Sequence, residues 1–215
     1  MKKALMVWGG WEGHEPEACI RLFASFLEEN GFEAAVTDDL EVYADSFRMR
    51  EFDLIVQCVT MGELTAAQEA GLLRAVEGGT GIAGWHGGLC DSFRNNTEYQ
   101  FMTGGQFVAH PGDIIEYKVR VTKPGDPIME GLSSFTIESE QYFMHVDPNN
   151  EVLATTTFSG EHAPWTGGAE MPVVWKKSWG DGKVFYCSMG HVEADFHNCP
   201  ELRTIVERGM LWAAR

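Results

Sequence analysis

Hydrophobic positions in the first 90 residues alternate between short apolar runs and stretches of helical spacing. The apolar runs predict buried strands, and they cover residues 4–8, 32–37, 52–59 and 81–83. Apolar residues recur at helical spacing over 16–30 and 65–76, and Thr65 and Gln68 form a capping-box pattern at the start of the second stretch. This alternation predicts a parallel sheet with helices on both faces.

The periodicity changes after the glycine-rich stretch near residue 104. Several later segments alternate at period two, which predicts half-exposed strands; they are 114–121, 135–140, 152–158, 173–179 and 183–189. Gly180-Asp181-Gly182 predicts a tight hairpin, and 200–214 an amphipathic helix. No linker interrupts the chain, so we expect one α/β domain over 1–215, with a mostly parallel sheet and an antiparallel extension.

Composition excludes several classes of partner. The hydrophobic share of 44% in 215 residues is typical of a folded protein. The formal charge of -16 repels phosphate backbones and anionic lipids, so we expect neither nucleic-acid nor membrane partners. The five cysteines include no C-x-x-C pair, which favours free thiols in a reducing compartment such as the cytoplasm.

The segment Gly84-Trp85-His86-Gly87-Gly88 follows the apolar run that ends at Ala83. Flanking glycines suit a sharp strand-to-helix turn, whose central residue is strained and projects at the carboxyl edge of the sheet. Open α/β sheets place their sites at that edge. Related patterns put a serine or cysteine nucleophile at the centre, whereas this chain has the imidazole of His86.

Other histidines also follow predicted strands or lie in glycine-rich loops. Histidine transfers protons near neutral pH and is the commonest transition-metal ligand. We therefore expect His86 and His191 to be catalytic, with Glu140 or Glu193 as the carboxylate partner. The same chemistry allows a divalent metal, zinc in first place, held by His86, His110 and His191, although the sequence contains no local metal-binding spacing.

Aromatic and polar residues near the same loops are candidates for binding a sugar ring, because aromatic faces pack against C–H surfaces. The candidates for substrate binding are Trp11, His14, Trp85, Gly87, Tyr142 and Trp165.

Five segments together resemble the ThuA-like (trehalose utilisation) family, which has the class I glutamine amidotransferase-like fold. They are V-W-G-G-W-E-G-H, G-W-H-G-G, G-G-Q-F-V-A-H-P, E-S-E-Q-Y and G-K-V-F-Y-C-S-M-G-H. The resemblance implies a flavodoxin-like three-layer sandwich and a link to sugar catabolism. Amidotransferases carry G-x-C-x-G at the elbow and a later H-x-E. Here His191 and Glu193 match the second motif, but His86 replaces the cysteine, so glutamine hydrolysis through a thioester is not expected.

These patterns favour an enzyme that acts on trehalose or a related keto-glycoside by acid–base or metal-assisted chemistry, as an isomerase, lyase or hydrolase. Two alternatives stay open: a non-catalytic sugar-binding or regulatory module, and an amidotransferase-type hydrolase that uses Cys90. Exposed strand edges in the second half would permit a homo-oligomer.

Overall fold

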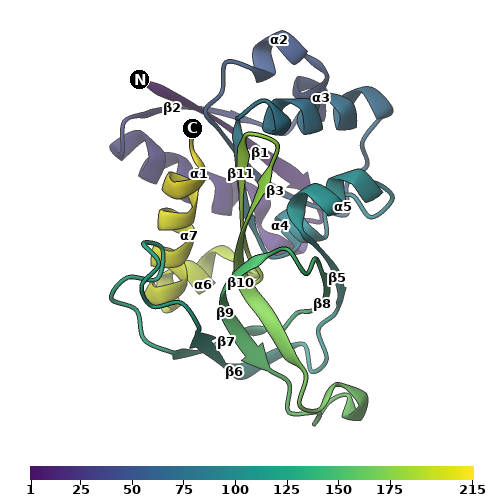
Figure 1. Ribbon diagram of the computed structural model, residues 1–215, viewed down its shortest axis with the longest axis vertical. Coiled ribbons are helices and arrows are strands. Elements are labelled where there is room, and N and C mark those ends of the chain that lie inside the picture. The colour runs from purple at the N-terminus through teal and green to yellow at the C-terminus, as the bar shows by residue number, and fades with distance from the viewer.

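A nine-stranded sheet forms the centre of the computed structural model, which describes residues 1–215 (Figure 1). Its first five strands are mutually parallel. In spatial order they are β2 (Phe32–Thr37), β1 (Lys2–Gly10), β3 (Leu54–Thr60), β4 (Gly81–Trp85) and β11 (Gly182–Cys187). Sequence predicts the first four of these strands as apolar runs, such as β3, where all seven residues are buried. The fifth, β11, was expected in the antiparallel extension, but it pairs parallel with β4.

Helices cover both faces of the parallel half and give the three layers. One face carries α1 (Pro16–Glu29), α6 (Glu193–Asn198) and α7 (Pro200–Ala213). The opposite face carries η2 (Leu40–Ala44), α2 (Ser46–Met49), α3 (Ala66–Glu77) and α5 (Thr97–Thr103). Two apolar cores result, one on each side of the sheet, and the predicted capping box of Thr65 and Gln68 begins α3.

The sheet continues with four antiparallel strands, so the expected extension is confirmed. They are β10 (Glu170–Trp179), β9 (Glu151–Thr157), β6 (Ile114–Val121) and β7 (Phe135–Glu140). Trp179 pairs with Gly182, which makes Gly180 and Asp181 the predicted tight hairpin. A separate two-stranded sheet of β5 (Gly105–Ala109) and β8 (Phe143–Val146) is not evident in the sequence pattern.

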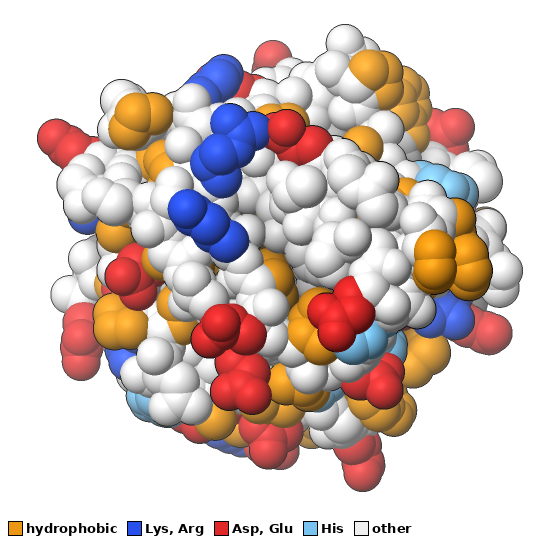
Figure 2. Space-filling view, turned by 90° about the horizontal axis from the view of Figure 1, so that it is seen from below, with side chains coloured by type: hydrophobic (Ala, Val, Ile, Leu, Met, Phe, Trp, Pro, Cys, Tyr) orange, Lys and Arg blue, Asp and Glu red, His pale blue; other side chains and the backbone are white.

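Short elements complete the chain at its loops: η1 (Glu12–His14), α4 (Gly87–Cys90) and η3 (Pro164–Thr166). All five cysteines are free and buried. No helix has both the length and the apolar character needed to cross a membrane. On the face in Figure 2, Lys and Arg side chains gather mainly in one area, and Asp and Glu side chains are spread over much of the rest.

Candidate functional site

His86 occupies the strained centre of the turn between β4 and α4. Its backbone has φ 49° and ψ -141°, a left-handed conformation that residues other than glycine rarely adopt. The turn is held by hydrogen bonds from the His86 N–H to the Cys187 carbonyl (2.7 Å) and from the Tyr186 hydroxyl to the His86 carbonyl (3.0 Å). The sequence-predicted elbow is therefore present, with an imidazole at its centre.

Gly87 makes room for a second imidazole, that of His14 from the loop after β1. A Cβ at Gly87 would lie 2.7 Å from the His14 ring and 2.9 Å from Thr60 Cγ2. The Thr60 hydroxyl at the end of β3 lies 2.8 Å from His14 Nδ1 and fixes the ring, leaving Nε2 for other partners. His14 is buried, and its ring centroid is 4.7 Å from that of His86.

A buried carboxylate reaches the elbow from the antiparallel half. Glu140 is the last residue of β7, which lies at the far edge of the sheet in strand order but below α6 in space (Figure 1). The Tyr117 hydroxyl donates to the Glu140 carbonyl at 3.2 Å and ties the end of β7 to β6. The chain thus brings Glu140 to residues that lie 50 or more positions away in sequence.

Three histidines and Glu140 form one compact group. Glu140 Oε2 lies 3.0 Å from His86 Nε2 and 3.5 Å from His191 Nδ1, and the two nitrogens are 3.4 Å apart. One donor atom from each of His14, His86, Glu140 and His191 lies within 4.8 Å of the other three. His191 is the most exposed of the four, so the group opens to solvent on its side.

The environment separates the protonation states of these groups. Burial raises the pKa of Glu140, but hydrogen bonds from His191 and His86 outweigh it and hold this pKa well below its usual range. Burial, with His86 and His191 nearby, lowers the pKa of His14 to about 3. Burial also lowers the pKa of His86, whereas the hydrogen bond to Glu140 raises that of His191. Near neutral pH the site therefore combines an anionic carboxylate with two neutral imidazoles.

Comparison with known proteins identifies the family. The family described as "ThuA: Trehalose utilisation" matches residues 3–213. The chain belongs to the ThuA family. A ThuA-like protein of Bacteroides uniformis is 20% identical with a TM-score of 0.80, over 99% of this chain and 91% of that one. One of Parabacteroides merdae is 18% identical with a TM-score of 0.81, over 99% and 89%.

A more distant fold relative is a cytoplasmic protein of Salmonella typhimurium, which is 12% identical with a TM-score of 0.68 over 99% of this chain and all of the other. These likenesses confirm the flavodoxin-like α/β fold. No curated protein matches the sequence.

In this ThuA-family chain, His110 stands beside the group rather than within it. Its Nε2 lies 3.8 Å from Glu140 Oε1, the oxygen that faces away from the other histidines. Its ring lies nearly parallel to those of Phe107 and Tyr142. Sequence reasoning grouped His110 with His86 and His191 as metal ligands. The structure places His14 in that group instead, because the loop after β1 ends beside the elbow.

The structure does not bring Glu193 to the His191 ring. Glu193 begins α6, and its carboxylate pairs with His197 one helical turn later at 2.6 Å. Asp195 accepts the backbone N–H of His191 at 2.9 Å instead. The H-x-E spacing fails here because a helix starts within it, and the carboxylate beside the His191 ring is Glu140.

The aromatic candidates for substrate binding divide into three environments. Trp85 is 1% exposed and packs on Phe23 in the core, so the structure removes it from the binding surface. Tyr142 is buried, and its ring stacks on that of His86 with the centroids 4.0 Å apart, which helps to fix the orientation of the imidazole. Trp11 is 47% exposed and lies edge-on to His14 at 4.7 Å, at the mouth of the site.

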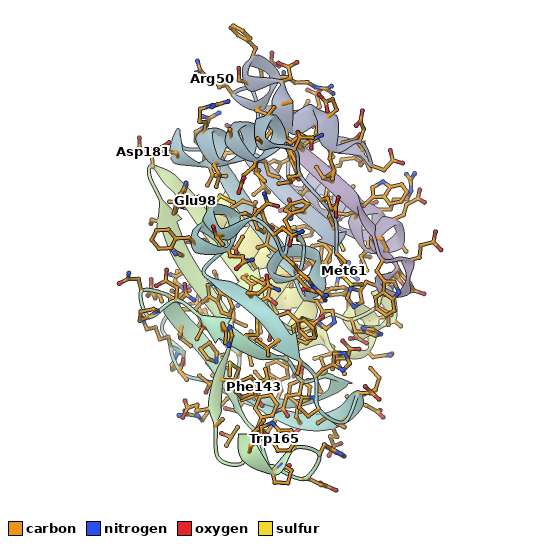
Figure 3. All side chains as sticks on the ribbon, turned by 90° about the vertical axis from the view of Figure 1, so that its right-hand side faces the viewer. Arg50, Met61, Glu98, Phe143, Trp165 and Asp181 are labelled. Atoms are coloured by element: carbon orange, nitrogen blue, oxygen red, sulfur yellow. The ribbon has the colours of Figure 1, made fainter.

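Trp165 is the most exposed tryptophan at 87% and lies away from the histidines. It sits in η3 at the lower tip of the molecule in Figure 3, well below Met61, which follows β3 at the site edge of the sheet. It could reach only an extended substrate.

Sequence reasoning missed the residues that fix the imidazoles. They are Thr60, whose hydroxyl bonds to the His14 ring; Ser188, whose carbonyl lies 2.9 Å from His86 Nδ1; and Asp195, whose carboxylate accepts the His191 backbone N–H. Thr60 alone carries a usable signal, because it is a polar residue at the carboxyl end of an apolar strand.

The substitution Gly87→Ala tests the close approach of His14. We expect at least about a tenfold loss of any activity that uses His14, because the new Cβ must displace the His14 ring, and displacements near 1 Å can cost up to about 100-fold. Gly125→Ala is the matched control, since no atom lies within 4 Å of its Cβ position. Equal activity of both variants, measured at equal folded fraction, would contradict this role for Gly87.

Proposed function

We propose that this protein is an enzyme of carbohydrate catabolism that acts on a sugar bearing a carbonyl group, such as a keto-glycoside. The observation that carries the proposal is the convergence of His14, His86, His191 and Glu140 at the elbow. Acid–base chemistry at this group takes the place of a thiolate. Membership of the trehalose utilisation family supports the substrate class.

The proposed step is removal of a proton from a carbon next to the carbonyl. The C–H electron pair forms an enolate, the proton passes to an imidazole, and the enolate is then reprotonated. A carbonyl acidifies neighbouring C–H bonds, and positioned imidazoles accelerate such transfers by about 10²- to 10⁴-fold.

A solvent-exchange assay tests this proposal directly. The protein is incubated with a 3-keto-glucoside in D₂O, and incorporation of deuterium next to the carbonyl is followed by NMR. We expect exchange with the wild-type protein and strongly reduced exchange with His86→Ala and His191→Ala. Full exchange in both variants would refute the proposal. Binding of the glycoside without exchange or turnover would favour a sugar-binding module.

The thiol of Cys90 gives a separate prediction. Cys90 is buried on α4, and burial raises the pKa of its thiol well above the ordinary value, so it forms little thiolate at neutral pH. We therefore expect Cys90→Ser to keep turnover within about twofold and iodoacetamide to leave the native protein active. Rapid inactivation by the alkylator that Cys90→Ser prevents would instead support the amidotransferase-type alternative.

A further inference from the structure

We infer that His14, His86, His191 and Glu140 form a binding site for one divalent transition-metal ion, zinc in first place. This inference rests on the proposed function for the role of the ion, whereas binding of the ion is measured independently. All four side chains already lie within mutual reach, since their donor atoms are no more than 4.8 Å apart.

Hydrogen-bond accounting at His86 leaves a place for one cation, either a proton or a metal ion, between its ring and Glu140. His86 Nδ1 lies 2.9 Å from the Ser188 carbonyl, which can only accept, so Nδ1 must carry the hydrogen. In the neutral ring, Nε2 then carries no hydrogen and is an acceptor. It faces Glu140 Oε2 at 3.0 Å, and this carboxylate oxygen is also an acceptor. A positive ion between these two atoms would satisfy both.

His191 and His14 complete the arrangement. His191 Nδ1 lies 3.4 Å from His86 Nε2 and 3.5 Å from Glu140 Oε2. Zinc bonds of about 2.1 Å in tetrahedral geometry place neighbouring ligands roughly 3.4 Å apart, close to these separations. The remaining nitrogen of His14 supplies the fourth donor, and Thr60 orients that ring as partners behind metal ligands commonly do.

The chemistry of the donors selects the ion. Imidazole nitrogens and one carboxylate suit zinc and its first-row neighbours, whereas calcium and magnesium prefer oxygen ligands throughout. The carboxylate leaves one net positive charge on a bound divalent ion. Such an ion would polarise a sugar carbonyl and acidify the neighbouring C–H bond, as the proposed reaction needs.

Metal titration of the chelator-treated, full-length protein tests the inference. Zn²⁺ affinity is measured by competition with a chromophoric chelator, and Co²⁺ is added separately for its visible absorption. We expect one ion per chain, with affinity at least about tenfold weaker in His86→Ala, Glu140→Gln and His191→Asn. His191 is partly exposed, so its variant is informative even if a variant at a buried position fails to fold.

The control is His145→Ala, which removes an exposed histidine of β8 outside the donor set and should keep wild-type Zn²⁺ affinity. An equal loss in this variant, or no stoichiometric binding by the wild-type protein, would overturn the inference. Full deuterium exchange by metal-free protein would overturn the role of the ion in the reaction while leaving the proposed function intact. Tight binding without activity on any keto-sugar would support the site and refute the function.

Discussion

Replacing Glu140 by glutamine is expected to lower kcat/KM by about 10²- to 10⁴-fold, the range typical for loss of a positioned acid or base. The Glu140 carboxylate contacts His86 at 3.0 Å, His191 at 3.5 Å and His110 at 3.8 Å. Glutamine keeps the shape but removes the charge that sets the protonation of His191. The measurement is the rate of deuterium exchange or turnover with a keto-glycoside.

Glu138→Gln is the control for this substitution. Glu138 lies two residues earlier on β7, and its side chain is exposed. The same chemical change there should leave activity unaltered. Comparable losses in both variants would mean that the effect comes from β7 as a strand and not from the carboxylate at the elbow.

Sequence periodicity predicted the main sheet because each of its strands carries a strong local signal. The apolar runs of β1, β3 and β4 and the alternation of β6 and β7 lie within a few residues of the observed bounds. The β5–β8 pair was missed because its strands have only five and four residues and lie far apart in sequence. Short strands of this kind depend on contacts that a local pattern does not contain.

The site was only partly predictable. His86 and His191 were found because each follows an apolar strand, and the structure shows that these two strands, β4 and β11, are parallel neighbours whose carboxyl ends meet at one edge. Glu140 comes from a strand four places beyond β11 in the sheet, and only the folding of the antiparallel half brings it close. Glu193 was preferred equally because the H-x-E spacing is local, but the start of α6 turns its side chain towards His197.

The strained elbow links these observations. A histidine with φ 49° costs of order 1–3 kcal/mol relative to a relaxed residue and persists only when surrounding contacts impose it. Here three contacts impose it: the hydrogen bond from the His86 N–H to the Cys187 carbonyl, the one from the Tyr186 hydroxyl to the His86 carbonyl, and the stacking of Tyr142 on the ring. Such strain concentrates at functional sites, which supports a functional role for the His86 side chain beyond packing.

Trp85→Ala is expected to reduce the free energy of unfolding by about 3–5 kcal/mol, the usual cost of removing a large buried aromatic ring. Trp85 is 1% exposed, and its ring lies 4.8 Å from Phe23 and 5.6 Å from Phe196. Urea titration and thermal unfolding measure the loss, which corresponds to a fall in Tm of roughly 10 °C.

The matched variant is Trp165→Ala, because the sequence pattern suggested substrate binding for both tryptophans but the structure buries Trp85 and exposes Trp165. Trp165 is 87% exposed, so its removal should change stability by less than about 0.5 kcal/mol. If a substrate extends to η3, this variant raises KM at unchanged Tm. A ring enclosed by Phe23 and Phe196 has no face left for a sugar. A stable Trp85→Ala protein with weakened substrate binding would therefore contradict the position of Trp85 between α1 and α6.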